Sequence, residues 1–310
     1  MDISVVVPLY NEAESLPELE SWIRRVMQEN NFSYEVIFVD DGSTDSSWEV
    51  IEQLAGANSA VRGIRFRRNY GKSPALNTGF ARAKGDVVIT MDADLQDSPD
   101  EIPELYRMIT KEKYDLVSGW KQKRYDPLSK TIPTKLFNAT ARKVSGIGNL
   151  HDFNCGFKAY RREVADSIDV YGELHRYIPV LAYRKGFRIA EIVVEHHARE
   201  FGKSKYGFER YLRGLFDSMT VAFLGKFYDR PMYFFGKIGL FLCMLGGLIC
   251  LYLTVLWCMG QGIGDRPLLM LGVLLLILGV QMFSTGFVGD MLVDATYRSR
   301  YNESHIKEKL

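Results

Sequence analysis

The sequence has few cysteines and no excess of either charge. The four cysteines form no CxxC pair and show no Cys/His spacing typical of a metal centre. This argues against a disulfide scaffold and against a structural zinc site. The 39 basic and 38 acidic residues leave a net charge of +1. With so balanced a charge, no nucleic-acid partner is predicted.

Charge is missing altogether from two long stretches near the C-terminus. Ile238–Cys258 has 21 residues without a charge, and Pro267–Gly289 has 23. Because a helix rises about 1.5 Å per residue, either stretch crosses a hydrocarbon core of roughly 30 Å. The alternative is a pair of buried core helices, but uncharged apolar runs of this length rarely occur twice in a soluble domain. The sequence therefore predicts a transmembrane hairpin with MGQGIGDR at its tip.

Basic residues flank this predicted hairpin on its open side. They precede the first span and follow the second at Lys226, Arg230, Lys237, Arg298, Arg300, Lys307 and Lys309. The positive-inside rule then predicts that both termini and the N-terminal domain are cytoplasmic. The start MDISVVVP lacks a basic segment followed by an apolar one, so no secretory signal peptide is expected.

The first 230 residues alternate between β-branched runs and segments with helical spacing. Strands are expected at residues 3–9, 34–42, 62–66, 86–94 and 114–120, and helices at 14–28, 46–54, 74–83 and 100–111. This alternation predicts an α/β fold, with a mostly parallel sheet that carries helices on both faces. In such sheets ligands bind beyond the carboxyl ends of the strands.

Carboxylates gather where three of these strands are expected to end. The first strand is followed by Glu12, the second closes in Asp40 and Asp41, and the fourth closes in Asp92 and Asp94. Alternate residues of a strand share a face, so the last two carboxylates are expected to point the same way. A divalent cation shared with a diphosphate is the natural partner of such a pair. A lone DxD is more often a solvated turn, but acidic residues at three strand ends favour a Mg²⁺ or Mn²⁺ site.

Six motifs occur along the chain in an order that resembles a known family. They are VVVPLYNE, VDDGSTDSS, RNYGKSPALNTGF, DADLQDSPDEIP, DFNCGFKAYRRE and REFGKSKYGF. The sequence resembles the family 2 glycosyltransferases of the GT-A fold. Within them it is most similar to the polyprenyl-phosphate glycosyltransferases, such as dolichyl-phosphate mannose synthase and the bacterial undecaprenyl-phosphate glucosyltransferases. The resemblance covers essentially the whole chain, including the two spans.

The resemblance implies a role for particular residues at the donor site. Those expected to contact the nucleotide sugar or shape its pocket are Pro8, Tyr10, Glu12, Asp40, Asp41, Lys72, Asp92, Gln96, Lys121 and Arg124. Asp94, together with Asp92, is expected to hold the metal. Asp152 is the implied catalytic aspartate, and Arg199 and Lys205 are expected to contact a phosphate. For Lys203, Arg210 and Arg213 a basic surface facing anionic lipid is the favoured interpretation.

The resemblance and the hydropathy pattern together suggest four segments. Residues 1–207 would be a cytoplasmic glycosyltransferase domain, 208–230 an amphipathic juxtamembrane helix, 231–290 the two spans and 291–310 a cytoplasmic tail. The implied partners are a nucleotide-sugar donor, a polyprenyl phosphate and the lipid bilayer, and the implied location is the bacterial inner membrane. Relatives with such a hairpin form homotetramers, and Gly246, Gly247 and Gly272 suit close helix contact.

The resemblance implies transfer of one hexose to polyprenyl phosphate with inversion. UDP-glucose is the favoured donor and GDP-mannose the alternative. A processive polysaccharide synthase is disfavoured, because the QxxRW motif and the additional spans are missing. A third hypothesis from another class is a catalytically silent, membrane-tethered binder of nucleotide sugars.

Overall fold

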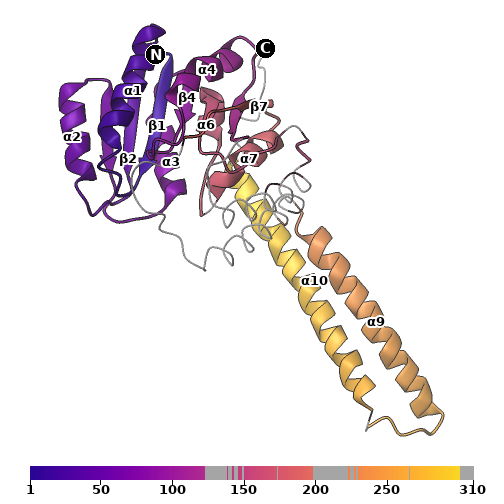
Figure 1. The fold of residues 1–310 in the computed structure, drawn as a ribbon. Helices are drawn as coiled ribbons and strands as arrows, with labels where there is room; N and C mark the ends of the chain where they lie inside the picture. The colour runs from indigo at the N-terminus through magenta and orange to yellow at the C-terminus, as the bar shows by residue number, and fades with distance from the viewer. Residues whose placement is uncertain are drawn as a thin grey trace. The chain divides into compact units, whose positions relative to one another are not determined.

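The computed structural model falls into two compact units, residues 1–222 and 223–310, and each is described by itself. The residues described are 1–122, 138, 142, 146–148, 150–172, 174–197, 223, 227, 230–264 and 266–300, with side chains as far as 295. The element labels follow Figure 1.

The N-terminal unit is built on a seven-stranded sheet with the order β3-β2-β1-β4-β6-β5-β7. The strands are β1 (Ile3–Leu9), β2 (Tyr34–Asp40), β3 (Val61–Arg65), β4 (Val87–Thr90), β5 (Leu116–Trp120), β6 (Lys158–Arg161) and β7 (Ile189–Val193). Only β6 among these strands runs antiparallel to its neighbours, β4 and β5. The predicted mostly parallel sheet is therefore confirmed.

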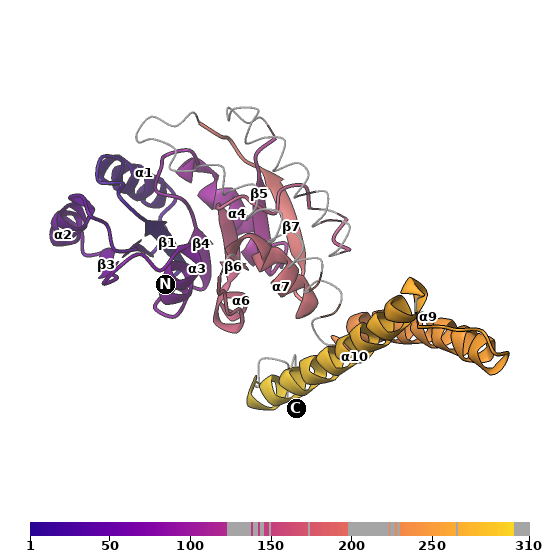
Figure 2. The same ribbon diagram turned by 90° about the horizontal axis from the view of Figure 1, so that it is seen from below.

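Helices cover both faces of this sheet (Figures 1 and 2). The helices are α1 (Leu16–Glu29), α2 (Ser47–Ala57), α3 (Lys72–Phe80), α4 (Ile102–Thr110), α6 (Arg162–Ser167) and α7 (Ile178–Arg184), with short 3-10 turns η1 (Pro99–Glu101) and η2 (Leu174–Tyr177). Figure 2 shows α1 and α4 on one side of the sheet and α3, α6 and α7 on the other. Between β5 and β7 the elements β6, α6, η2 and α7 are short, and their patterns gave no prediction from the sequence.

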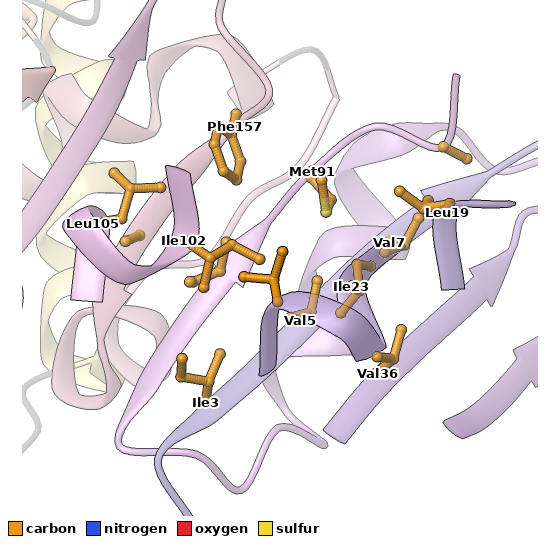
Figure 3. Close-up of a cluster of buried hydrophobic side chains, with 14 of the residues drawn as sticks. Ile3, Val5, Val7, Leu19, Ile23, Val36, Met91, Ile102, Leu105 and Phe157 are labelled. Atoms are coloured by element: carbon orange, nitrogen blue, oxygen red, sulfur yellow. The ribbon is translucent and has the colours of Figure 1, made fainter. Parts of the chain in front are cut away.

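Alternation along β1 explains why α1 packs where it does. Figure 3 shows Val5 and Val7 of β1 beside Leu19 and Ile23 of α1, with Ile3 further along the same strand. All five are buried in one continuous apolar core. Because successive side chains of a strand point to opposite faces, the odd residues of β1 meet α1 while the even ones meet the other layer.

The fourth strand is shorter than the sequence predicts. It ends at Thr90, so Asp92 and Asp94 lie in the loop that follows and not on the strand itself. In that loop Leu95 has φ +57°, a left-handed conformation that is costly for a leucine. The turn of the chain, and not strand alternation, therefore sets the positions of the two carboxylates.

The described part of the C-terminal unit is dominated by two long apolar helices, α9 (Met232–Cys258) and α10 (Pro267–Arg300). Met232–Cys258 and Pro267–Ala295 are long and apolar enough to cross a membrane. Both helices extend past the uncharged stretches of the sequence. The predicted spans of about 238–258 and 267–289 are therefore shorter than the helices that contain them.

Glycines lie where α9 and α10 pack together. A Cβ on Gly246 would stand 2.8 Å from the Gly272 carbonyl oxygen, and one on Gly239 would stand 2.7 Å from that of Gly279. Such close contact requires glycine. Gly246 and Gly272, expected to serve contacts between copies of the chain, are therefore used within the hairpin, whereas Gly247 faces open space.

Candidate functional site

The loops that follow β1 and β2 are tied together at the carboxyl edge of the sheet. The backbone N–H of Asn11 donates to Ser43 Oγ at 2.9 Å, and the N–H of Thr44 donates to Asn11 Oδ1 at 2.8 Å. Leu9 pairs with Asp40 in the parallel register of the two strands. Pro8, Tyr10 and Glu12 therefore lie beside the Asp40–Asp41 loop.

Asp40 is fully buried at the end of β2. Its Oδ1 accepts a hydrogen bond from the N–H of Ser43 at 2.8 Å, while its Oδ2 accepts none from the described residues. Arg65 Nε stands 3.5 Å from Oδ2 and partly balances the charge. A buried acceptor without a donor is costly, so this oxygen suits a ligand N–H or O–H.

Asp41 shapes the loop that leads into α3. Its carboxylate accepts hydrogen bonds from the backbone N–H groups of Tyr70 at 2.7 Å and Gly71 at 2.9 Å. Burial raises the pKa of Asp41, and these two donors oppose that rise. Both oxygens are occupied by the loop, so Asp41 positions Lys72, the first residue of α3.

Lys72 lies against the acidic loop after β4. Its Nζ forms an ion pair with Asp92. Burial alone would lower the pKa of Lys72, but the charges of Asp92, Asp97 and Asp94 outweigh burial and raise it. All three carboxylates therefore lie near one lysine, and the structure brings together Lys72, Asp92 and Asp94.

A second lysine pairs with the last aspartate of this loop. Lys121 Nζ lies 2.5 Å from Oδ1 of Asp97, whose side chain is fully buried. Burial would lower the pKa of Lys121, and the charge of Asp97 raises it instead. Gln96 is held from the other side, because the N–H of His197 donates to its carbonyl oxygen at 3.0 Å. His196 also forms an antiparallel β-bridge with Asp97, and this bridge holds the loop against the chain after β7.

The acidic loop fits a divalent cation only in part. No group of three or more His, Cys, Asp or Glu side chains that could hold a metal occurs among the described residues. Asp94 is 9% exposed and lies two residues after Asp92. Mg²⁺ is commonly bound by one or two carboxylates together with substrate phosphates. Asp92 and Asp94 are therefore sufficient if a diphosphate supplies the other ligands.

Asp152 lies in a tightly bonded turn and is 1% exposed. Its Oδ1 accepts hydrogen bonds from the N–H of Asn154 at 3.1 Å and from Asn138 Nδ2 at 3.4 Å. Glu191 of β7 holds the same turn. Its Oε1 accepts from the N–H groups of His151 and Asp152 at 2.8 Å each, and its Oε2 lies 2.7 Å from His151 Nδ1.

Several predicted residues lie outside the described part of the chain. They are Arg124, Arg199, Lys203, Lys205, Arg210, Arg213 and most of the amphipathic segment 208–230. The roles expected of them stay predictions.

Sequence reasoning missed four residues or pairs near the site. Asp97, Lys158, the pair His175–Arg176 and Glu191 were given no role in it. Lys158 had a signal, because a lysine inside the otherwise apolar run GFKAY is unusual in a buried strand. Glu191 had none, because a single glutamate in a strand is typical of a solvated face.

Comparison with known proteins identifies the family. The sequence profile described as Glycosyl transferase family 2 matches residues 4–169. The dodecaprenyl-phosphate galacturonate synthase of Rhizobium johnstonii is 36% identical over 315 residues, which cover 100% of this chain and 93% of that protein. The undecaprenyl-phosphate 4-deoxy-4-formamido-L-arabinose transferase of Proteus mirabilis is 34% identical, with 96% of this chain and 92% of that protein covered.

Solved structures share the fold of the N-terminal unit. The glucosyl-3-phosphoglycerate synthase of Mycobacterium tuberculosis with UDP has a TM-score of 0.56 and 21% identity, covering 72% of this chain and 79% of that one. A second structure of that enzyme contains Mn²⁺, UDP and phosphoglyceric acid and also has a TM-score of 0.56, at 20% identity, with 72% and 78% covered. The fold is thus GT-A, and the chain belongs to glycosyltransferase family 2, as its motifs predicted.

Proposed function

We propose that this protein transfers a single sugar from a nucleotide-sugar donor to a polyprenyl phosphate at a membrane surface. The observation that carries the proposal is the 36% identity to a dodecaprenyl-phosphate galacturonate synthase across the whole chain, apolar helices included. A polyprenyl phosphate is also the acceptor named for the arabinose transferases. The acceptor is thus common to relatives whose sugars differ.

Within this proposal, the strand-end loops bind the donor. Oδ2 of Asp40, which accepts no hydrogen bond from the described residues, would accept one from the nucleotide base or ribose. Pro8, Tyr10, Glu12 and Gln96 would line the pocket. A divalent cation, Mg²⁺ or Mn²⁺, held by Asp92 and Asp94 would act as a Lewis acid toward the departing diphosphate. Lys72 and Lys121 would keep the acidic loop in place before the donor binds.

The acceptor needs little activation, because a phosphate monoester is already anionic near neutral pH. It needs to be held and desolvated beside the donor sugar. Arg124, Arg199 and Lys205 remain proposed phosphate contacts. Asp152 remains the proposed catalytic aspartate. Its burial and its bonds to Asn138 and Asn154 argue that it also orders the turn on which it lies.

The identity of the sugar belongs to the proposal as well. UDP-glucose is the donor favoured by the sequence, with GDP-mannose as its alternative. The galacturonate synthase now favours UDP-galacturonate as a further candidate. The cytoplasmic orientation, the bacterial inner membrane and a homotetramer are carried forward as predictions.

A transfer assay tests the function and the donor together. Detergent-purified full chain is incubated with undecaprenyl phosphate, Mn²⁺ and one radiolabelled donor at a time: UDP-glucose, GDP-mannose or UDP-galacturonate. We expect label in the lipid phase from one donor, and loss of that label when a chelator is added.

Two controls sharpen the assay. Undecaprenol in place of its phosphate should accept no sugar, because it lacks the anionic nucleophile. Donor-derived label that never enters the lipid phase, while UDP or GDP still binds, would contradict enzyme activity and favour a silent nucleotide-sugar binder.

A further inference from the structure

A small cavity adjoins the acidic loop. Its basic side chains are Lys72 of α3, Lys158 of β6, and His175 and Arg176 of η2, and its other polar lining includes Thr90 of β4, Asn154 before β6 and Tyr160 of β6. Gly156 also lines it, and a Cβ there would stand 2.7 Å from Oδ2 of Asp92. The cavity therefore lies directly beside Asp92, one of the two proposed metal ligands.

The charge of this cavity is of one sign. None of the described residues that line it is acidic. Lys158 is only 2% exposed, and its Nζ donates to the main-chain carbonyls of Phe153 and Cys155. It forms no ion pair with any carboxylate in the described part of the chain. A buried ammonium held by carbonyl oxygens alone is costly, and an anion would relieve that cost.

The neighbouring His175 also lies near positive charges. His175 Nδ1 lies 3.2 Å from Ser73 Oγ, which fixes the ring against α3. Burial lowers the pKa of His175 well below its usual range, and the charges of Lys72 and Arg176 lower it further. The ring therefore adds a hydrogen-bonding group to the cavity that it lines.

The reaction proposed above needs two anions side by side. The donor diphosphate would be balanced by the metal at Asp92 and Asp94. The acceptor phosphate must approach the same point, where those carboxylates would repel it unless it meets cations of its own. The cavity beside Asp92 is lined by such cations, Lys72, Lys158 and Arg176.

Resting on the proposed function, we propose that this cavity binds the phosphate monoester of the polyprenyl acceptor through Lys158, His175 and Arg176. Arg176, which is half-exposed, gives one charge of the lining. Lys158, which is buried, gives another. These residues are distinct from Lys121, Arg124, Arg199 and Lys205, to which the family resemblance assigns ligand contacts, although Lys158 lies within the motif DFNCGFKAYRRE.

The primary test is the Arg176→Gln variant in the full chain, because a half-exposed side chain can be shortened without loss of folding. The apparent KM for undecaprenyl phosphate should rise about ten-fold or more, as expected for a lost charge-assisted hydrogen bond, while the KM for the donor stays within about two-fold. Arg176→Lys should recover part of the loss. Lys111→Met, which removes an exposed cation after α4, is the matched control and should change neither KM.

A binding measurement without any donor separates this site from the transfer reaction. Geranyl phosphate should raise the thermal unfolding midpoint of the wild type and of Lys111→Met, but not that of Arg176→Gln, and geraniol should raise none. That pattern supports the site even if no donor is ever used by the enzyme.

Two results would overturn the proposal. Equal stabilisation of all three proteins by geranyl phosphate would place the phosphate elsewhere. A rise in the donor KM alone, with the acceptor KM unchanged, would mean that the cavity recognises the transferred sugar, for example its carboxylate.

Discussion

At the scale of single residues, the site depends on carboxylates whose roles differ although they are neighbours in sequence. Asp40 has one buried oxygen that accepts no hydrogen bond from the described residues, whereas Asp41 uses both of its oxygens on the backbone of Tyr70 and Gly71. The motif indicates that both aspartates are important, but it does not show that their hydrogen-bond partners differ. This difference depends on a loop that lies 29 residues away along the chain.

Asp94 should be needed for the chemical step more than for folding. Asp94→Asn keeps the shape of the side chain but removes its charge, so we expect the transfer rate to fall roughly 100-fold or more. The Mn²⁺ concentration for half-maximal rate should also rise. Rate measurements across a Mn²⁺ series test this, with Asp100→Asn, an exposed aspartate paired with Arg25, as the control. An unchanged rate for Asp94→Asn would remove it from the site.

Glu35 should make the N-terminal unit acid-sensitive. Its buried carboxylate accepts hydrogen bonds from Ser4 Oγ at 2.7 Å, Arg62 Nη1 at 2.6 Å and the Lys84 N–H at 2.7 Å. Burial would raise the pKa of Glu35, but these partners outweigh it and lower the pKa below 4.5. Because the folded pKa is depressed, the stabilisation is present above pH 4.5 and is lost as pH falls through the folded pKa.

Denaturant unfolding between pH 6 and pH 3 tests this linkage. Glu35→Gln should be less stable than the wild type at pH 6 by about 1–3 kcal/mol, and its stability should fall less on acidification. The exposed Glu18→Gln is the control. Parallel pH dependences for Glu35→Gln and the wild type would show that another group is responsible.

At the scale of elements, the hairpin shows how glycine spacing sets helix contact. A Cβ at Gly246 would meet the backbone of Gly272 and Leu276 at 2.8–3.0 Å, and a Cβ at the adjacent Gly247 would meet nothing within 4 Å. Hydropathy predicts both helices but cannot tell which of two neighbouring glycines faces the partner.

These two glycines give a matched pair of substitutions. Alanine favours helix over glycine by about 1 kcal/mol, so Gly247→Ala should leave the thermal midpoint in detergent unchanged or raised. Gly246→Ala must push α9 and α10 apart and should lower it. Equal effects of the two substitutions would contradict the packing of the hairpin.

Other elements show how much of the fold could be predicted from the sequence. Residues 3–9 and 114–120 were expected as strands from their apolar runs, and they contain β1 and β5. The sequence did not predict β6, α6, η2 or α7, which have only four to seven residues each. Elements so short show too few periods to be recognised, and they contribute five residues to the lining of the cavity beside Asp92.

At the scale of the whole molecule, the chain joins a GT-A unit to a pair of apolar helices, and relatives match both parts together. The fold and the family were predicted from motif order and hydropathy. The sugar was not, because donor choice depends on a few side chains around the pocket. The galacturonate and formamido-arabinose relatives differ in sugar at similar identity to this chain.

The mass of the lipid product tests the central claim most directly. Undecaprenyl phosphate is incubated with the full chain, Mn²⁺ and the accepted donor. The molecular mass of the extracted lipid is then measured by mass spectrometry. The account predicts one new species, heavier than the acceptor by a single sugar residue. A ladder of heavier species would indicate a processive synthase, and an unchanged acceptor with every donor would contradict transfer to polyprenyl phosphate.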